Sequence, residues 1–219
     1  MLENQNVREE PNPMSLSETT RIEAFSDGVF AIAITLLILE IQVPTELPEG
    51  TRLWTALLQQ GASYISYLAA FATIGIMWIN HHRMFNIIRR ADSWLLVFNL
   101  LLLLGITFIP FPTTLVADYL GTPDASTAMA VYAGNTVVIA IFYNLLWRYA
   151  AHNDHLLDPN IDMNAIRAIN RGYLFGPLLY SVAFVFAFIS VPVSLAIVIG
   201  LALFFALPPR NPLTARSLL

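Results

Sequence analysis

Apolar residues gather into six long stretches along the 219-residue chain, and polar residues mark the segments between them. A helix crosses a bilayer with about 20 mostly apolar residues, and these stretches approach or exceed that length. The pattern therefore predicts six membrane-spanning helices. They lie at 24–43, 62–82, 94–117, 128–149, 172–190 and 192–208.

The composition indicates that these stretches face lipid rather than the core of a soluble helical bundle. Hydrophobic residues make up 57% of the chain and charged residues 12%, whereas soluble domains are about 25% charged. We therefore expect an all-α membrane protein with one six-helix domain, at 21–209, in the lipid bilayer. The polar segments at 1–20 and 210–219 are expected to be mobile tails.

The arginines predict the orientation of this domain. All 11 basic residues are arginines, and only Arg52 falls outside the two tails and one alternate set of connections. Membrane proteins keep such residues on the cytoplasmic side. Both termini and the connections at 83–93 and 150–171 are therefore predicted to be cytoplasmic, which agrees with six spans. In the connection at 44–61 we expect a short interfacial helix anchored by Trp54.

Several kinds of chemistry are disfavoured by the composition. The chain has no cysteine, which excludes disulfides, thiolate chemistry and cysteine metal sites. It has no basic stripe of the kind that binds nucleic acid, so no such partner is expected. A membrane enzyme needs converging acid, base or metal groups, and only Asp27 and His81 come into question. We therefore expect neither an enzyme nor a catalytic residue, and no cofactor.

Two groups of histidines come into question as metal ligands. His81 and His82 are adjacent, so on a helix their side chains point about 100° apart and are poorly placed to bind one ion. A structural hydrogen bond is the favoured role for that pair. The polar connection at 150–171 favours solvation over a metal site, although it contains four potential ligands. They are His152, Asp154, His155 and Asp158.

Helix periodicity divides the first span into two faces. At about 100° per residue, Asp27 projects about 140° away from Ile32, towards the opposite side of the helix. Thr35 lies at the edge of the Ile32 face, and Phe25 and Gly28 fall on the same side as Ile32. The centre of this face is purely apolar. Its residues are Ile32, Leu36 and Leu39.

Polar residues of the first three spans are predicted to share one layer near the cytoplasmic side. A charge inside a membrane segment is costly, so such residues are expected to form a complete network that joins helix one to helices two and three. Arg21 is close enough along the helix to pair with Asp27. The expected members of the layer are Arg21, Ser26, Asp27, Asn80, His81 and Asn99.

Three motifs resemble the transmembrane protein 175 family of potassium channels. They are Arg21-x-x-x-Phe25-Ser26-Asp27, WxNHHR at 78–83, and FNLLLLLGITFIPFPT at 98–113. The resemblance covers nearly all of the membrane region. Animal members carry two six-helix repeats, and this chain, with no internal repeat, resembles the shorter prokaryotic form. That form is similar to homotetramers in a prokaryotic cell membrane, and a single unit needs such assembly to surround a central pathway.

The resemblance implies a passive, potassium-preferring cation channel whose pore is lined by the first helix. Ile32, Leu36 and Leu39 would form successive apolar rings, with Ile32 the narrowest, and Thr35 would contribute to ion preference. Phe25, Ser26 and Asp27 would hold the helix without touching ions. No TVGYG-like segment occurs, so a carbonyl selectivity filter is not expected.

Other functions remained open. A proton-coupled secondary transporter would use Asp27 and His81, but carriers often have internal repeats and broken midplane helices, of which the sequence gives no sign. A structural protein without transport is a further alternative. Glu40, near the far end of the first span, fits either an outer ring that attracts cations or a residue at headgroup level.

Overall fold

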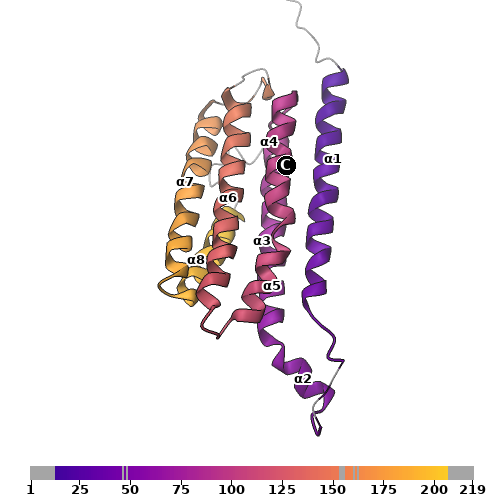
Figure 1. Cartoon of the computed structure of the whole chain (residues 1–219). Helices are drawn as coiled ribbons and strands as arrows, with labels where there is room; N and C mark the ends of the chain where they lie inside the picture. Colours follow the sequence, from indigo (N-terminus) through magenta and orange to yellow (C-terminus); the bar gives the residue numbers. More distant parts are fainter. Residues whose placement is uncertain are drawn as a thin grey trace, which may run out of the picture.

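The computed structural model describes residues 13–206 except 46, 48, 153–155, 160 and 162; the side chains of 13–18, 163–165, 168 and 171 are also left out. The regular elements in this part are all helical (Figure 1). In chain order they are α1 (Pro13–Leu36), η1 (Leu37–Glu40), α2 (Leu53–Gln59), α3 (Gly61–Phe85), α4 (Ser93–Thr107), α5 (Pro110–Tyr119), α6 (Ala125–His152), α7 (Met163–Ala187) and α8 (Val191–Ala206).

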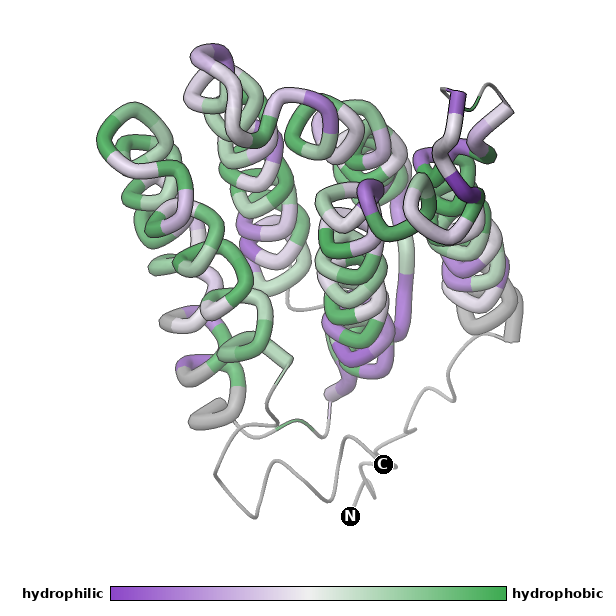
Figure 2. The backbone as a smooth tube through the Cα atoms, turned by 90° about the horizontal axis from the view of Figure 1, so that it is seen from below, coloured by the Kyte–Doolittle hydropathy of each residue, from purple (hydrophilic) through white to green (hydrophobic). Residues whose placement is uncertain are grey.

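Each predicted apolar stretch lies mainly on one or two helices of the described part. In the described part of the chain, 4 helical segments are long and apolar enough to cross a membrane, and two apolar helices are shorter. Apolar residues predominate along the tubes of Figure 2. The long segments are Thr19–Glu40, Gly61–Phe85, Ser93–Tyr119 and Ala125–His152, and the shorter ones are Gly172–Ala187 and Val191–Ala206.

Two helices begin earlier than their apolar stretches predict. Helix α1 starts at Pro13, so residues 13–20 of the expected tail are helical. Helix α7 starts at Met163, inside the connection predicted at 150–171. Hydropathy marks the part of a helix that faces lipid, whereas the backbone continues as a helix into polar surroundings. Residues 1–12 and 207–219 lie outside the described part.

The third span is broken between α4 and α5, where Pro110 has no N–H to donate to Ile106. The backbone N–H of Ile109 donates to the Ile106 carbonyl instead, at 3.1 Å. The carbonyl of Gly105 thereby loses its usual donor. The Asn135 side chain of α6 donates to it at 3.1 Å, so the break leaves this carbonyl paired.

A second asparagine of α6 supports a proline inside α7. Pro177 cannot donate to the carbonyl of Tyr173, four residues earlier. Asn144 donates to that carbonyl at 2.6 Å. Helix α6 contacts α4, α5, α7 and α8, so it is the central support of the bundle. Its two asparagines satisfy backbone groups that prolines leave free in its neighbours.

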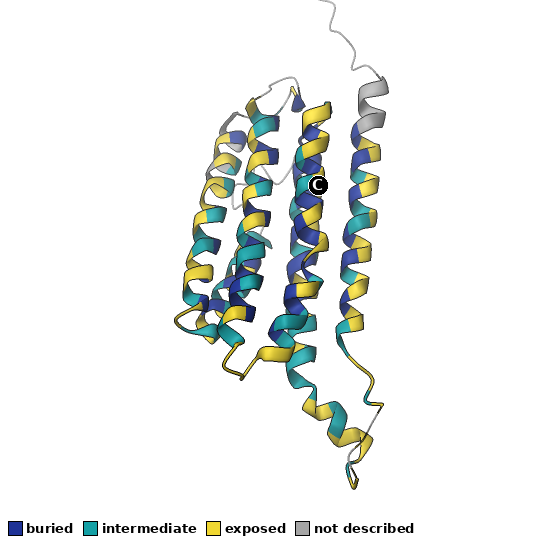
Figure 3. Cartoon of the chain, viewed as in Figure 1, coloured by how far each residue is buried: buried dark blue, intermediate teal, exposed yellow. Residues whose placement is uncertain are grey.

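Helix α1 lies at the edge of the bundle and packs against α3 and α4 (Figure 1). Its buried residues recur every three or four positions and form one narrow stripe. Exposed residues recur along the rest of its surface (Figure 3). The buried stripe consists of Thr19, Ile22, Ser26, Phe30 and Ala33, and it continues into η1 with Leu37.

The connections at the arginine-rich end of the bundle are fastened to each other. Ile88 and Leu157 form an isolated antiparallel bridge. Beside it, Arg89 and Asp158 make an ion pair at 3.3 Å. Thr19 of α1 donates to the carbonyl of Arg89 at 3.1 Å. The start of α1 is therefore attached to the same set of loops.

Replacing Asn144 by leucine should lower the stability of the protein by about 1 kcal/mol, because the Tyr173 carbonyl then has no donor. In a Pro177→Ala background, residue 177 regains an N–H that can donate to the Tyr173 carbonyl. The loss of stability caused by Asn144→Leu should then be less than half as large. Thermal unfolding of the four proteins in detergent measures this coupling. Equal costs in both backgrounds would show that Asn144 does not substitute for the missing N–H.

Candidate functional site

One chain of buried hydrogen bonds joins the first three apolar spans. Asn99 of α4 donates to the Ser26 hydroxyl of α1 at 2.9 Å. Its carbonyl oxygen lies 2.9 Å from Nε2 of His81 on α3. All three side chains are buried, with exposed fractions of 0–2%. A single amide thus holds α1, α3 and α4 together in a place that water does not reach.

The donor and the acceptor of every hydrogen bond in this network follow from the Ile22 carbonyl, which can only accept. The Ser26 hydroxyl donates its one hydrogen to the Ile22 carbonyl at 2.8 Å, so it can only accept from Asn99. Asn99 must then turn its amide hydrogens to Ser26 and its oxygen to His81. His81 therefore carries its hydrogen on Nε2. The Nδ1 atom of His81 is buried and has no hydrogen-bond partner among the described residues.

Aromatic rings enclose His81 and keep it in place. Phe85 stacks on its imidazole with ring centroids 4.4 Å apart, and Phe30 of α1 meets it edge-on at 5.4 Å. Phe30 is itself buried. The same histidine thus contributes both a hydrogen bond and an aromatic contact to the α1–α3 junction.

Two further polar pairs connect α1 and α3. The Trp78 indole donates to the Asp27 carboxylate at 2.8 Å, and His82 lies 2.7 Å from the Glu23 carboxylate. Glu23 and Asp27 are four residues apart on α1, and Trp78 and His82 are four residues apart on α3. Because the two helices run in opposite directions, the two pairs are adjacent on one face. Trp78 and His82 also stack at 6.1 Å.

Arg21 and Asn80, expected in the polar layer, and Phe25, expected to hold the helix, lie outside the network. Arg21 is exposed and forms no ion pair with Asp27, because the two side chains leave the helix in different directions. Phe25 is 57% exposed, on the side away from the buried stripe. Asn80 is half-buried and makes no side-chain hydrogen bond within the described part, because its neighbour His81 occupies the position that faces α1 and α4.

The apolar face of α1 predicted from the sequence is not buried by any other residue in the described part of the chain. The exposed fractions are 59% for Ile32, 45% for Leu36 and 70% for Leu39. Thr35 is exposed on the same side, and its hydroxyl donates to the Ile32 carbonyl at 2.9 Å. An exposed and mainly apolar surface, with Thr35 as its polar member, thus follows the outward side of α1 and η1.

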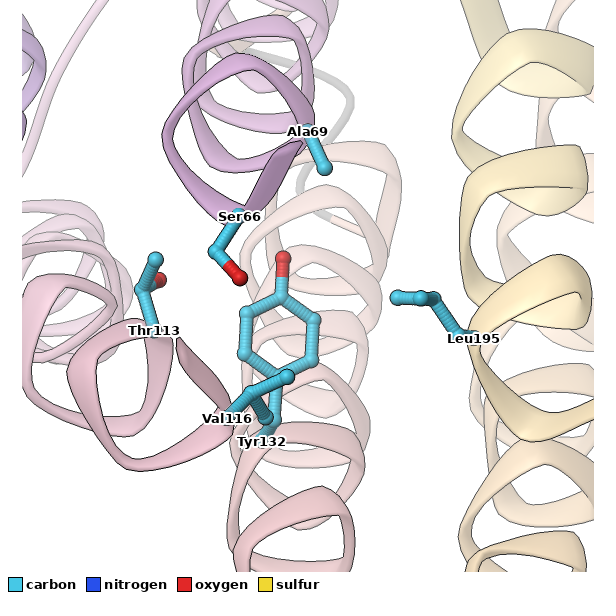
Figure 4. Close-up of a pocket in the computed structure, with 6 residues that line it drawn as sticks. All are labelled: Ser66, Ala69, Thr113, Val116, Tyr132 and Leu195. Carbon is cyan, nitrogen blue, oxygen red and sulfur yellow. The ribbon is translucent and has the colours of Figure 1, made fainter. Parts of the chain in front are cut away.

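The cavity drawn in Figure 4 does not offer a second site. It lies between α3, α5, α6 and α8, and it is too small for anything larger than a water molecule. Its lining is mainly apolar: Ser66, Ala69, Thr113, Val116, Tyr132 and Leu195. Among the described residues, no three histidine or acidic side chains converge as metal ligands. Asp154 and His155 lie outside the described part.

Sequence reasoning missed Trp78 and the Glu23–His82 pair as links between α1 and α3. A usable signal was present, because acidic residues four apart in α1 match Trp78 and His82, also four apart, in α3. In antiparallel helices such spacings bring both pairs into register. The direction of each side chain around its helix was the information that the residue pattern lacked.

These features define an all-helical integral membrane protein whose first apolar span stands at the edge, held by a buried polar chain. The family described as "Endosomal/lysosomal potassium channel TMEM175" matches residues 21–110. A potassium channel of Chamaesiphon minutus is 51% identical over 192 residues, 87% of this chain and 95% of the relative. One of Streptomyces collinus is 44% identical over 192 residues, 87% of this chain and 92% of the relative.

A solved structure agrees with these relatives. The crystal structure of a lysosomal potassium-selective channel TMEM175 homolog from Chamaesiphon minutus superposes with a TM-score of 0.78. Its sequence identity is 48%, and the match covers 92% of this chain and 98% of that one. The chain belongs to the TMEM175 family.

Replacing Asn99 by leucine should lower stability by about 1–3 kcal/mol, because Nε2 of His81 is left buried without an acceptor. Asn80→Leu is the matched control: Asn80 is one residue from His81 and half-buried, and its replacement should change stability by less than about 0.5 kcal/mol. Thermal unfolding in detergent compares the two. If both variants lost the same stability, Asn99 would not be the link described above.

Proposed function

We propose that this protein is a passive, potassium-preferring cation channel in which α1 of each subunit lines a shared pore. The observation that carries the proposal is the outward face of α1, where Ile32, Leu36 and Leu39 remain exposed along a helix anchored on its other side. The channels of Chamaesiphon minutus and Streptomyces collinus support potassium as the permeant ion.

The proposed assembly is a homotetramer. One chain presents only one wall of a pathway, because α1 stands at the edge of its own bundle (Figure 1). Identical copies arranged about a closed symmetry axis would bring their α1 faces together around a central space. The family membership and the uncovered apolar face both favour this arrangement, and potassium ions, lipid and further copies of the chain are its partners.

The proposed orientation has six spans and both termini in the cytoplasm. The described arginines other than Arg52 lie at the end of the bundle where α1 starts, and basic residues favour the cytoplasmic side. Residues 21–209 would form the channel domain between two cytoplasmic tails. Since the relatives named above are bacterial, we infer a prokaryotic cell membrane.

The conduction path that we propose has an apolar constriction in place of a carbonyl filter. Four residues of helix rise about 6 Å, so Ile32 and Leu36 would form rings about that far apart, followed by Leu39. Such rings close by excluding water and conduct when a small widening lets water in. Potassium gives up its hydration more readily than sodium, which favours it at a narrow ring.

Thr35 is the proposed contributor to ion preference. Its hydroxyl hydrogen is used by the Ile32 carbonyl, and the oxygen keeps both of its lone pairs as acceptors. An oxygen between apolar rings is the one polar ligand that this face would offer an ion. The buried network of Ser26, His81 and Asn99 would fix the helix that carries these groups, without contacting ions.

The geometry of Asp27 and His81 disfavours a proton-coupled carrier. The two side chains share no hydrogen bond, because Asp27 pairs with Trp78 and His81 with Asn99. The onward bond from His81 runs through an amide, which holds its hydrogens and does not relay protons as a carboxyl or an imidazole does. A coupled proton pathway through this layer therefore lacks a continuous chain of titratable groups.

The reversal potential tests the proposed function. Purified protein in a planar bilayer, with potassium on one side and sodium on the other, should give currents that reverse at a potential favouring potassium. Imposing a proton gradient alone should not drive the flux. Absence of current from intact oligomers, or a flux that requires a proton gradient, would overturn the channel.

Replacing Ile32 by asparagine should raise single-channel conductance and move the reversal potential towards zero. A ring of polar side chains remains hydrated at a smaller pore diameter than a ring of apolar side chains. Ile65→Asn on α3 is the matched control, since Ile65 is 60% exposed and Ile32 is 59% exposed. Currents of Ile65→Asn should resemble those of the unmodified protein. An unchanged conductance in Ile32→Asn would remove Ile32 from the constriction.

A further inference from the structure

The far end of the exposed apolar face is built by a change of helix type. Helix α1 ends at Leu36, and the next turn, η1, is a 3-10 helix that runs to Glu40. A 3-10 helix has three residues per turn, so Leu37 and Glu40 lie on the same side of η1. The residues between them are turned away from that side.

The burial of η1 follows this geometry. Leu37 is 0% exposed, whereas Ile38 is 51% exposed and Leu39 is 70% exposed. Glu40 is half-buried. The turn contacts both α3 and α5, so its inward side meets two neighbouring helices. The backbone becomes extended at Ile41, which ends the helix immediately after Glu40.

The carboxylate of Glu40 has a partner on α5. The Thr114 hydroxyl donates its hydrogen to Oε2 of Glu40; the Pro110 carbonyl of the same helix, 3.1 Å away, is the alternative acceptor for this one hydrogen. Thr114 follows the helix break at Pro110, so α5 reaches the end of α1 through the bend in the third span. Leu39 therefore lies between two points that are held by the bundle, Leu37 by burial and Glu40 by this bond.

We propose that Glu40 and Thr114 are positioning residues that hold the outermost apolar ring, Leu39, at its distance from the pore axis. The proposal depends on the proposed function, in which α1 lines the pore. It assigns to the Glu40 carboxylate a role as hydrogen-bond acceptor towards α5. The competing role is a ring of negative charge that concentrates cations at the pore mouth.

Two substitutions separate the hydrogen bond from the charge. Thr114→Val removes the donor and keeps the Glu40 charge, whereas Glu40→Gln removes the charge and keeps an acceptor oxygen. Thr114→Ser restores a hydroxyl as a rescue variant. Thr107→Val is the matched control, because the Thr107 hydroxyl bonds only within its own helix, to the Leu104 carbonyl. All variants are compared as intact oligomers in planar bilayers.

The readouts are open probability and single-channel conductance at low and at high ionic strength. Thr114→Val should change open probability about five-fold, which corresponds to one lost hydrogen bond, and Thr114→Ser should return it towards the original value. Glu40→Gln and Thr107→Val should leave it unchanged. At low salt, where screening is weakest, the conductance of Glu40→Gln should equal that of the unmodified protein.

The opposite pattern overturns the proposal. If Glu40→Gln conducted less than the unmodified protein at low salt, while Thr114→Val kept the open probability of the unmodified protein, Glu40 would act through its charge. If Thr114→Val and Thr107→Val gave identical open probabilities, the bond would not position Leu39. Absence of current from the unmodified protein would instead contradict the proposed function, so the two failures are distinguishable.

Discussion

The arrangement of the first three spans depends on one buried amide. Asn99 uses both ends of its side chain, its N–H group towards Ser26 of α1 and its oxygen towards His81 of α3. In a low-dielectric interior such bonds are strong when complete and costly when broken. Lipid offers no competing hydrogen bond, so the network selects one rotation and one depth for α1. The apolar contacts of Phe30 and Leu37 then extend the same alignment along the helix.

The rest of the bundle is organised to keep this junction in place. Helix α6 contacts four neighbours, and its asparagines pair with carbonyls that Pro110 and Pro177 leave without their usual donors. Helix breaks are tolerated inside a membrane protein only where such partners exist. In contrast, α1 has one buried stripe and a free apolar face. In the proposed assembly, further copies of the chain would cover this half-exposed helix.

The candidate site shows that a residue pattern predicts the height of a side chain along its helix but not its direction around the helix. Ser26, His81 and Asn99 were expected at one level because counting residues along a helix determines height, and hydrogen bonds join these three side chains. Arg21, Phe25 and Asn80 lie at a similar level but point elsewhere. The partner of Asp27 is Trp78 rather than Arg21, since the face that α1 turns towards α3 selects which residues meet. Rotation about a helix axis depends on the neighbouring helices, and the sequence does not state it directly.

The sequence by itself determined the class of protein. Apolar stretches of membrane length, few charges and arginines concentrated in the tails and in alternate connections indicate helices in a bilayer, because the cost of placing charge in lipid acts on composition alone. The division of α1 into a polar and an apolar face also follows from its periodicity. Only the tertiary structure decided the breaks that α6 supports, the direction of the Ser26–Asn99–His81 bonds and the 3-10 turn that joins Glu40 to Thr114. These features arise from contacts between segments far apart in the chain, and local pattern carries no record of which segments meet.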